Sequence, residues 1–358
     1  MSIERADLSL ARILAQRLAG PPLTDATAAV THLGCVQAQD LPGALTSVAL
    51  RTADRDRAGV RAALDAGELV RSWPMRGTLH LIAARDAAWM CELTSPRMYA
   101  QAAKRRAELG VTDAMLAHAG ELAAAAITAE GPRTRAELIE MWQPHGYAEP
   151  SGRAYHLLMT LCHTGLLAQG PLRAGGKLEQ CFVVLDDWVP EPVTPADREA
   201  ALARWAERGF VSHGPATAAD LARWTGLAMG DVRRGIAGAS GLVTQEIDGV
   251  PHWYAAELPD LLAEHRRAAR GLLLLPGFDE LILGYADRTP TLDRDHETLV
   301  VPGRNGVFKP TVITGGRAVG TWRRVKVKGV DRIEATPFPG AKLPAEASLT
   351  RAFSRLPS

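Results

Sequence analysis

Gln37 and Gln39 lie two positions apart, shortly before Pro42, in a mainly apolar segment. Side chains two apart diverge by about 200° on a helix but share one face of an extended chain, and a proline disfavours helix at the residue before it. If the preceding helix ends at about Val36, both amides face one ligand. An amide can orient water or a polar substrate but carries no charge. The same pattern also fits two polar residues of a loop.

Carboxylates and histidines are the other side chains that could bind a metal or catalyse proton transfer. Four acidic residues gather late in the chain: Asp279, Glu280, Asp287 and Asp293. Their spacing alone does not decide between a metal site and structural roles. His80, His156 and His163 lack carboxylates at metal-ligand spacing. We therefore predict no metal, and no residue pattern calls for a cofactor.

Charge and cysteine usage limit the classes of protein. Lys and Arg number 41 against 40 Asp and Glu, a net charge of +1, so any surface that binds nucleic acid must be a local one. The 4 cysteines form no Cys-x-x-Cys pair, as expected of small buried side chains in a reducing compartment. No run of about 18 apolar residues suggests a membrane span. We expect a cytoplasmic monomer.

An internal repeat gives the clearest prediction of fold. Gly131–Leu138 reads Gly-Pro-Arg-Thr-Arg-Ala-Glu-Leu, and Gly214–Leu221 reads Gly-Pro-Ala-Thr-Ala-Ala-Asp-Leu. In each copy a threonine stands three residues before an acidic residue, which is the pattern of a capping box and predicts the start of a helix. Both copies then continue with a second helical pattern, as in a helix-turn-helix.

Strand pairs follow both predicted helix-turn-helix segments. Residues 242–254 read as two strands joined at Asp248-Gly249. In the first copy, the helix 153–163 ends at Gly165, and strands at 166–169 and 179–185 flank a loop with Arg173 and Lys177. Each copy therefore resembles a winged helix, a module that binds DNA or serves in dimerisation and scaffolding.

The remaining segments are less regular. Helical patterns occur near 8–19, 24–36 and 56–66, followed by an extended stretch at 73–82, and a diverged winged unit would fit them. Beyond about residue 270 the sequence predicts a sheet: a strand at 272–276, and hairpins that turn at Gly303–Gly306 and at Gly315-Gly316.

The predicted fold class is α+β, with tandem winged helix-turn-helix units, three in all, and a C-terminal β-rich region. The predicted domains are an N-terminal region with the diverged unit and the Gln-Ala-Gln motif, two further winged units, and the β-rich region; their bounds are 1–125, 126–190, 196–262 and 268–358.

Over nearly its full length, the chain resembles the winged-helix DNA glycosylases of the AlkZ and YcaQ type. The resemblance is carried by Gly34–Asp40, Arg71–His80, His213–Thr217 with Asp220, Leu275–Asp279 with Asp287-Arg288, and Gly320–Trp322. The catalytic motif of that family is Gln, an apolar residue, then Gln in the AlkZ branch or Asp in the YcaQ branch. Gln37-Ala38-Gln39 has the AlkZ-like form.

The resemblance implies a C-shaped scaffold of three winged units around catalytic Gln37 and Gln39, and structural roles for the acidic cluster. It also implies a monofunctional glycosylase that excises alkylated purines from double-stranded DNA, including bulky and crosslinked adducts of DNA-alkylating natural products. The host would thereby repair or resist such agents. Asp40 adjoins the motif and is a rival general base. The alternative is a winged-helix transcriptional regulator that cleaves nothing, although this chain has no heptad stretch for dimerisation.

Basic residues of the β-rich region are the predicted DNA contacts. Alternating Lys326 and Lys328 would share one strand face and follow the phosphates, although lysines also protect the edges of sheets. The full predicted set is Arg304, Asn305, Lys309, Arg317, Arg323, Arg324, Lys326 and Lys328.

Overall fold

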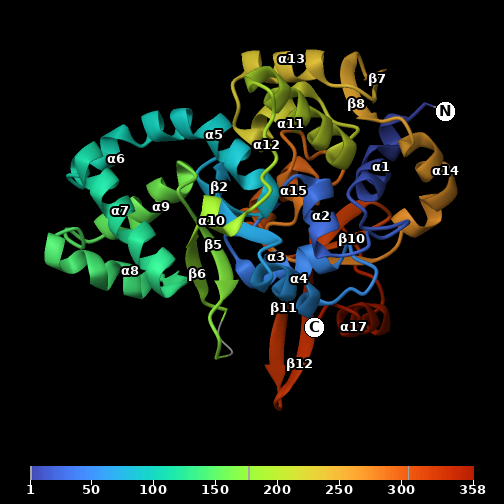
Figure 1. The fold of residues 1–358 in the computed structure, drawn as a ribbon. Coiled ribbons are helices and arrows are strands. Elements are labelled where there is room, and N and C mark those ends of the chain that lie inside the picture. Colours follow the sequence, from blue (N-terminus) through green and yellow to red (C-terminus); the bar gives the residue numbers. More distant parts are fainter. Residues whose placement is uncertain (1, 176–177, 305) are drawn as a thin grey trace. The chain divides into compact units, whose positions relative to one another are not determined.

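The computed structural model describes residues 2–175, 178–304 and 306–358, which form two compact units (Figure 1). The first unit comprises the chain up to Val60 together with Leu202–Ser358, and the second comprises Arg61–Ala201. The two boundaries fall inside the helices α4 (Arg57–Asp65) and α11 (Arg198–His213). Within the described residues, no helix combines the length and the apolar character needed to cross a membrane.

The first unit contains helices from both ends of the chain. Besides α11 they are α1 (Leu8–Ala15), α2 (Ala26–Leu33), α3 (Leu41–Ala49), α12 (Ala218–Thr225), α13 (Met229–Gly238), α14 (Leu258–Ala269), α15 (Glu280–Leu283), α16 (Glu297–Val300) and α17 (Glu346–Ser354). Its strands are β1 (Val36–Gln37), β7 (Leu242–Ile247), β8 (Val250–Ala255), β9 (Leu273–Leu275), β10 (Thr311–Thr314), β11 (Arg317–Val327) and β12 (Val330–Pro337).

The core of this unit joins segments that are distant in the sequence. All eight residues of α1 are buried, and its Leu10 and Ile13 share one apolar cluster with Leu262 of α14 and Leu275 of β9. The predicted helix at 8–19 is shorter in the structure, because Arg17 takes a left-handed conformation with φ of 56°. Such a residue cannot continue a right-handed helix.

Both repeats begin with the predicted capping box. The Thr134 hydroxyl accepts the N–H of Glu137 while the Glu137 carboxylate accepts that of Thr134, and Thr217 and Asp220 do the same. After these caps come helix, helix and hairpin. They are α8 (Arg135–Trp142), α9 (Arg153–His163), β5 (Leu167–Leu172) and β6 (Gln180–Val184) in the first repeat, and α12, α13, β7 and β8 in the second. The order of elements is the predicted one; the assignment of three winged units stays a prediction.

The second unit contains the first repeat and the helices before it. Its helices are α5 (Ala84–Gln101), α6 (Ala103–Glu108), α7 (Asp113–Glu130), α8 (Arg135–Trp142), α9 (Arg153–His163) and α10 (Leu185–Trp188). Five strands pair in the order β3-β2-β5-β6-β4, with bounds β2 (Leu69–Met75), β3 (Thr78–Ala83), β4 (Arg133–Thr134), β5 (Leu167–Leu172) and β6 (Gln180–Val184). All of their pairings are antiparallel. Trp73 and Trp142 lie in the apolar core of this unit.

The C-terminal sheet has the antiparallel order β12-β11-β10-β9, which leaves β9 at one edge. The predicted hairpin at Gly315-Gly316 is confirmed, since it joins β10 to β11. The predicted hairpin at Gly303–Gly306 is wrong: α16 and the 3-10 turn Pro302–Arg304 precede that position instead of a strand. Gly303 has φ of 63°, a left-handed conformation that kinks the chain within this turn, and glycine adopts it in many kinds of turn besides a hairpin.

A long hairpin of β11 and β12 extends away from the rest of its unit, at the red end of the chain (Figure 1). It turns at Lys328-Gly329, where both residues have positive φ. The prediction that Lys326 and Lys328 share one strand face is therefore wrong, because β11 ends at Val327. On one face of the hairpin, Trp322 packs edge-on against Phe353 of α17, with ring centroids 6.0 Å apart.

Candidate functional site

The two predicted catalytic glutamines lie on an extended segment directly after α2. That helix ends at Leu33, three residues before the predicted position, because Gly34 takes a φ of 79° and turns the chain. Gln37 lies on β1 and is only 5% exposed, whereas Gln39 follows the strand and is exposed. The segment is extended as predicted, but not because of Pro42: Leu41, the residue before it, is the first residue of the helix α3. The convergence of both amides on one ligand stays a prediction.

A buried carboxylate holds the backbone of Gln37. The Gln37 N–H donates to Oε1 of Glu280 over 2.9 Å, and Nε1 of Trp224 donates to Oε2 over 3.1 Å. Nε2 of His213 lies 3.6 Å from the same Oε2. Glu280 is completely buried, and a buried carboxylate is stable only when such partners replace its water. Glu280 therefore fixes the position of the motif rather than facing a substrate.

The neighbouring carboxylate, Asp279, forms a buried ion pair with Arg51. Nη1 and Nη2 of Arg51 lie 2.9 and 3.1 Å from the two oxygens of Asp279, and both side chains are almost fully buried. The Ser47 hydroxyl donates to the same carboxylate over 2.6 Å. Ser47 lies on α3, which starts directly after Asp40, and Arg51 follows that helix. The ion pair therefore ties α3 to the segment that carries Glu280.

Further polar side chains extend this network towards α1. Oε1 of Gln16 accepts from Arg51 over 2.9 Å, and Nε2 of Gln16 donates to the Tyr285 hydroxyl over 3.0 Å. The Arg12 guanidinium lies 3.8 Å from the centre of the Tyr285 ring and 3.6 Å from the Asp220 carboxylate. Burial raises the pKa of Tyr285, so its hydroxyl remains a donor. A network of buried hydrogen bonds therefore holds the site in a fixed geometry.

The acidic cluster of the sequence has structural partners. Besides the contacts of Asp279 and Glu280, the Asp287 carboxylate accepts from the backbone and hydroxyl of Thr289, and Asp293 pairs with Arg317. Within the described residues, no three His, Cys, Asp or Glu side chains come together as a metal site would need.

His32, in the last turn of α2, makes the stability of the folded protein depend on pH. Its pKa is lowered from 6.5 to about 4, mainly by burial and to a smaller extent by the nearby charges of Arg17, His213 and Arg51, while a hydrogen bond to the Ala15 carbonyl acts in the opposite direction. The unfolded chain therefore binds a proton between pH 6.5 and 4 that the folded chain does not bind. We expect the free energy of unfolding to fall by about 2–3 kcal/mol on acidification through that range.

The contribution of His32 can be measured with His32→Gln, which keeps an N–H donor for the Ala15 carbonyl. Urea denaturation at several pH values should show a flatter pH dependence for this variant than for the parent protein. Parallel profiles for the two proteins would show that His32 titrates normally in the folded state.

Asp40, the rival base, lies at the N-terminal end of α3 and is exposed. A Cβ atom at Gly43 would lie 2.6 Å from Oδ2 of Asp40, so the glycine leaves room for the carboxylate in the first turn of the helix. Asp40 therefore stays open to solvent beside Gln39.

Several predicted DNA-contacting cations already have acidic partners. Arg323 pairs with Glu334 and Arg324 with Asp331, and all four groups are at least partly exposed. Arg317 pairs with Asp293 and also donates to two carbonyls, from Thr289 and Pro290. Arginines held in this way are less available to phosphate than unpaired ones.

The lysines of the predicted set are exposed. Within the described part of the chain, no ion pair engages Lys309, Lys326 or Lys328. Lys328 lies at the turn of the long hairpin, and Lys326 is opposite Asp331 in its register. Arg304 is the last residue of the turn after α16, and Asn305 lies outside the described residues.

Three buried positioning residues could not be predicted from sequence patterns: Arg12, Arg51 and Trp224. A partial signal was present, since Arg12 stands within the apolar run Leu8–Ala15 and Arg51 lies two residues after the apolar helix that ends at Ala49. A charge inside an apolar segment needs a buried partner. Nothing in the local sequence identifies that partner, which lies more than 200 residues away.

Comparisons with known proteins cover nearly the whole chain. The family described as "DNA glycosylase AlkZ-like" matches residues 30–357. An "Interstrand DNA cross-link repair glycosylase" of Streptomyces sahachiroi is 28% identical over 334 residues, which cover 89% of this chain and 86% of that protein. The solved structure of Streptomyces sahachiroi DNA glycosylase AlkZ is similar with a TM-score of 0.81 and 25% identity, over 100% of this chain and 99% of that one.

The family match includes the Gln-Ala-Gln motif, the segment with Asp279 and Glu280, and both repeats. The α+β fold agrees with the solved relative along the whole chain. The chain therefore belongs to the AlkZ-like family of DNA glycosylases.

Proposed function

We propose that this glycosylase hydrolyses the N-glycosidic bond of purines alkylated at N7 in duplex DNA, including bulky and crosslinked adducts, with Gln37 and Gln39 as catalytic residues. The observation that carries the proposal is the motif segment, whose backbone is fixed at Gln37 by the buried Glu280. A relative named for interstrand crosslink repair supports the substrate class. We further propose a role in repair of, or self-resistance to, DNA-alkylating natural products.

The chemistry of an N7-alkylated purine suits a pair of amides. Such a base is already cationic, so it leaves as a neutral molecule and needs no acid to protonate it. What remains is to hold a water against the sugar as positive charge develops there. Positioning alone lowers a barrier by several kcal/mol, and amide oxygens and N–H groups can orient a water without a formal charge. An undamaged nucleoside would lack this activation.

The carboxylates near the motif divide into two kinds. Glu280 and Asp279 are buried and occupied by hydrogen bonds, so neither is available to take a proton from water. Asp40 is exposed and adjoins Gln39. In the proposed mechanism the two glutamines orient the water, and Asp40, at the start of α3, is not the base.

Asp40→Asn tests that assignment. We expect base release in single turnover to stay within about threefold of the parent rate, because the variant keeps the shape of the side chain and removes only its charge. General base catalysis contributes about 10²–10⁴-fold. A loss of that size, together with loss of the ionisation of Asp40 from the pH–rate profile, would instead make Asp40 the base.

We also propose that the basic residues of the β11–β12 hairpin contact phosphates of the duplex. Lys328 supports this best, since it is exposed at the turn and no described carboxylate neutralises it. Arg323 serves as a comparison, because Glu334 already pairs with it at 2.6 Å.

Lys328→Gln should weaken binding to all duplex sequences alike and reduce the slope of log affinity against log salt by about one. Arg323→Gln should change the slope less. Fluorescence anisotropy across a salt series measures both. Equal slopes for parent and Lys328→Gln would remove the turn from the DNA interface.

The function itself is tested with a duplex that carries one N7-methylguanine. Incubation with the protein, then cleavage of abasic sites by alkali, should give a strand break at the modified position and release the free modified base. An unmodified duplex is the control. Binding without release would make the protein a regulator, and release from a methylated but not a crosslinked duplex would restrict the proposed substrates.

A further inference from the structure

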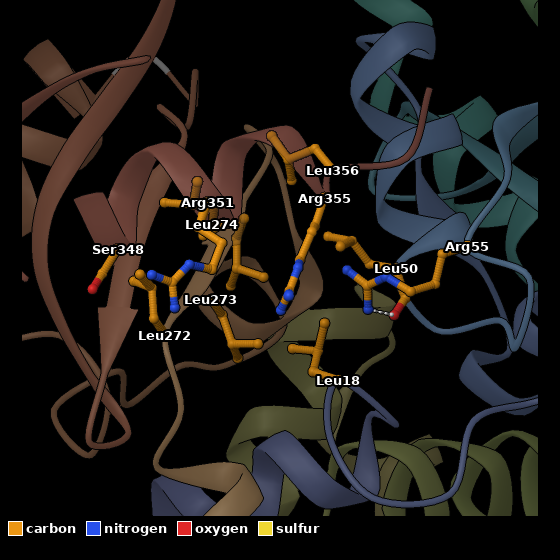
Figure 2. A pocket seen from close by; sticks show the side chains of 12 residues that line it. Leu18, Leu50, Arg55, Leu272, Leu273, Leu274, Ser348, Arg351, Arg355 and Leu356 are labelled. Carbon is orange, nitrogen blue, oxygen red and sulfur yellow. Dashed lines mark hydrogen bonds between the residues drawn. The ribbon is translucent and has the colours of Figure 1, made fainter. Parts of the chain in front are cut away.

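We propose that a second site in the first unit, apart from the glutamine motif, binds a small organic anion with an apolar body, such as an alkyl carboxylate. The site is a pocket of about 490 Å³ between α17, β9 and the ends of α1 and α3. That volume lies within the range of small-molecule sites. Figure 2 shows the side chains that line it. The inference does not depend on the proposed substrate of the enzyme.

Leucines form one part of the pocket wall. Those from the edge strand and the segment before it are Leu272, Leu273, Leu274 and Leu275, and those from elsewhere are Leu18, Leu50 and Leu356. β9 is the last strand of its sheet, so no strand of the described chain covers this side. An alkyl chain laid along these leucines would be removed from water, which favours its binding.

Three arginines form the polar part of the wall. Arg55 precedes α4, Arg351 lies on α17, and Arg355 follows α17. In the view of Figure 2, the guanidinium of Arg355 lies between those of Arg351 and Arg55. Within the described residues, no carboxylate pairs with any of them. All three arginines are exposed, so water and salt screen their mutual repulsion, but an anion among them would accept charge-assisted hydrogen bonds from several guanidinium groups at once.

Arg55 is held in place for such a contact. Its backbone takes a left-handed conformation with φ of 53°, which is strained for a residue other than glycine. Its Nη1 donates to the Leu50 carbonyl over 3.3 Å, while the residue as a whole is exposed to solvent. Strained residues of this kind often occur at ligand sites. The remaining donors of the guanidinium are left for a ligand.

The combination of surfaces favours an amphipathic small molecule over the DNA backbone. A row of arginines alone would suit phosphates, but DNA phosphates have no apolar part that would use the leucine wall. An alkyl carboxylate uses both surfaces at once. The carboxylate would lie at the arginines, where planar guanidinium groups bind it through paired hydrogen bonds, and the chain would follow β9.

Isothermal titration of the full-length protein with octanoate tests the proposal. Two half probes serve as controls: octanol, which has the alkyl chain without the charge, and acetate, which has the charge without the long chain. We expect saturable 1:1 binding of octanoate, and affinity at least about tenfold weaker for either half probe. Arg351→Gln with Arg355→Gln should weaken octanoate binding at least about tenfold. Arg233→Gln, a matched change at an exposed arginine of α13, should leave it unchanged.

Leu272→Gln provides a second variant that keeps all the arginines. It should weaken octanoate binding and leave the weak acetate binding as it was. The proposal is overturned if octanoate does not bind, if acetate binds as tightly as octanoate, or if octanol does. It is also overturned if duplex DNA displaces octanoate and the double arginine variant loses duplex affinity in parallel, because the arginines would then belong to the DNA interface.

Discussion

Replacing both Gln37 and Gln39 by alanine is expected to abolish release of the modified base while binding to an undamaged duplex stays within about twofold. Each amide orients the water or the sugar in the proposed mechanism, and removal of a single group that stabilises a transition state lowers the rate by about 10²–10³-fold. Single-turnover release of N7-methylguanine measures the first quantity, and anisotropy with an unmodified duplex measures the second.

Gln37 is buried, whereas Gln39 is exposed. A single substitution at Gln39 therefore tests catalysis without disturbing the core. Gln39→Ala should keep the urea midpoint of the parent and lose at least about a hundredfold in rate. Gln101→Ala, at an exposed position at the end of α5, is the matched control and should change neither quantity. If base release and duplex affinity fell together, the glutamines would be structural.

The second large effect concerns stability. Arg51→Met should lower the free energy of unfolding by about 3–5 kcal/mol, because it leaves the buried Asp279 carboxylate without its cation. The exposed pair of Arg323 and Glu334 gives the contrast, since Arg323→Met should cost no more than about 1 kcal/mol. Urea denaturation of the two variants at the same pH measures the difference.

A second substitution identifies the cause of that loss. Arg51→Met combined with Asp279→Leu should be more stable than Arg51→Met alone, because a buried apolar pair avoids the cost of an unpaired charge. The double variant should still lose activity, since Asp279 also accepts from Ser47 and caps α15. Additive losses of stability would mean that the two side chains act independently.

Local features of the sequence predicted much of the fold. Thr134 and Thr217 identified two helix starts because a capping box involves residues only three positions apart. The turn at Asp248-Gly249 was predicted for the same reason. The failures near Gly303 and Lys328 are also local: glycine permits several turns, and a run of alternating residues does not show where a strand ends.

The site was only partly predictable. The Gln-Ala-Gln motif is contiguous and could be read directly, whereas the partner that fixes it, Glu280, is 243 residues away. Arg51 and Asp279 are separated by 228 residues. Such pairs depend on how the core of the first unit assembles. Periodicity along the chain predicts local helices and strands but not which distant residues come together. Their identity had to come from the three-dimensional arrangement.

The discontinuous first unit has a consequence for how the protein is made. Helix α1 shares its core with α14 and β9, and Glu280 holds the backbone of Gln37. The segment near the start of the chain can therefore reach its folded position only after residues made much later are available. During synthesis at about 5–20 residues per second, the span from Gln37 to Glu280 takes on the order of 10–50 s to emerge. A nascent chain stalled before that point would have the glutamines but no platform beneath them. The base excision that we propose for these glutamines therefore becomes possible only after residue 280 has been made.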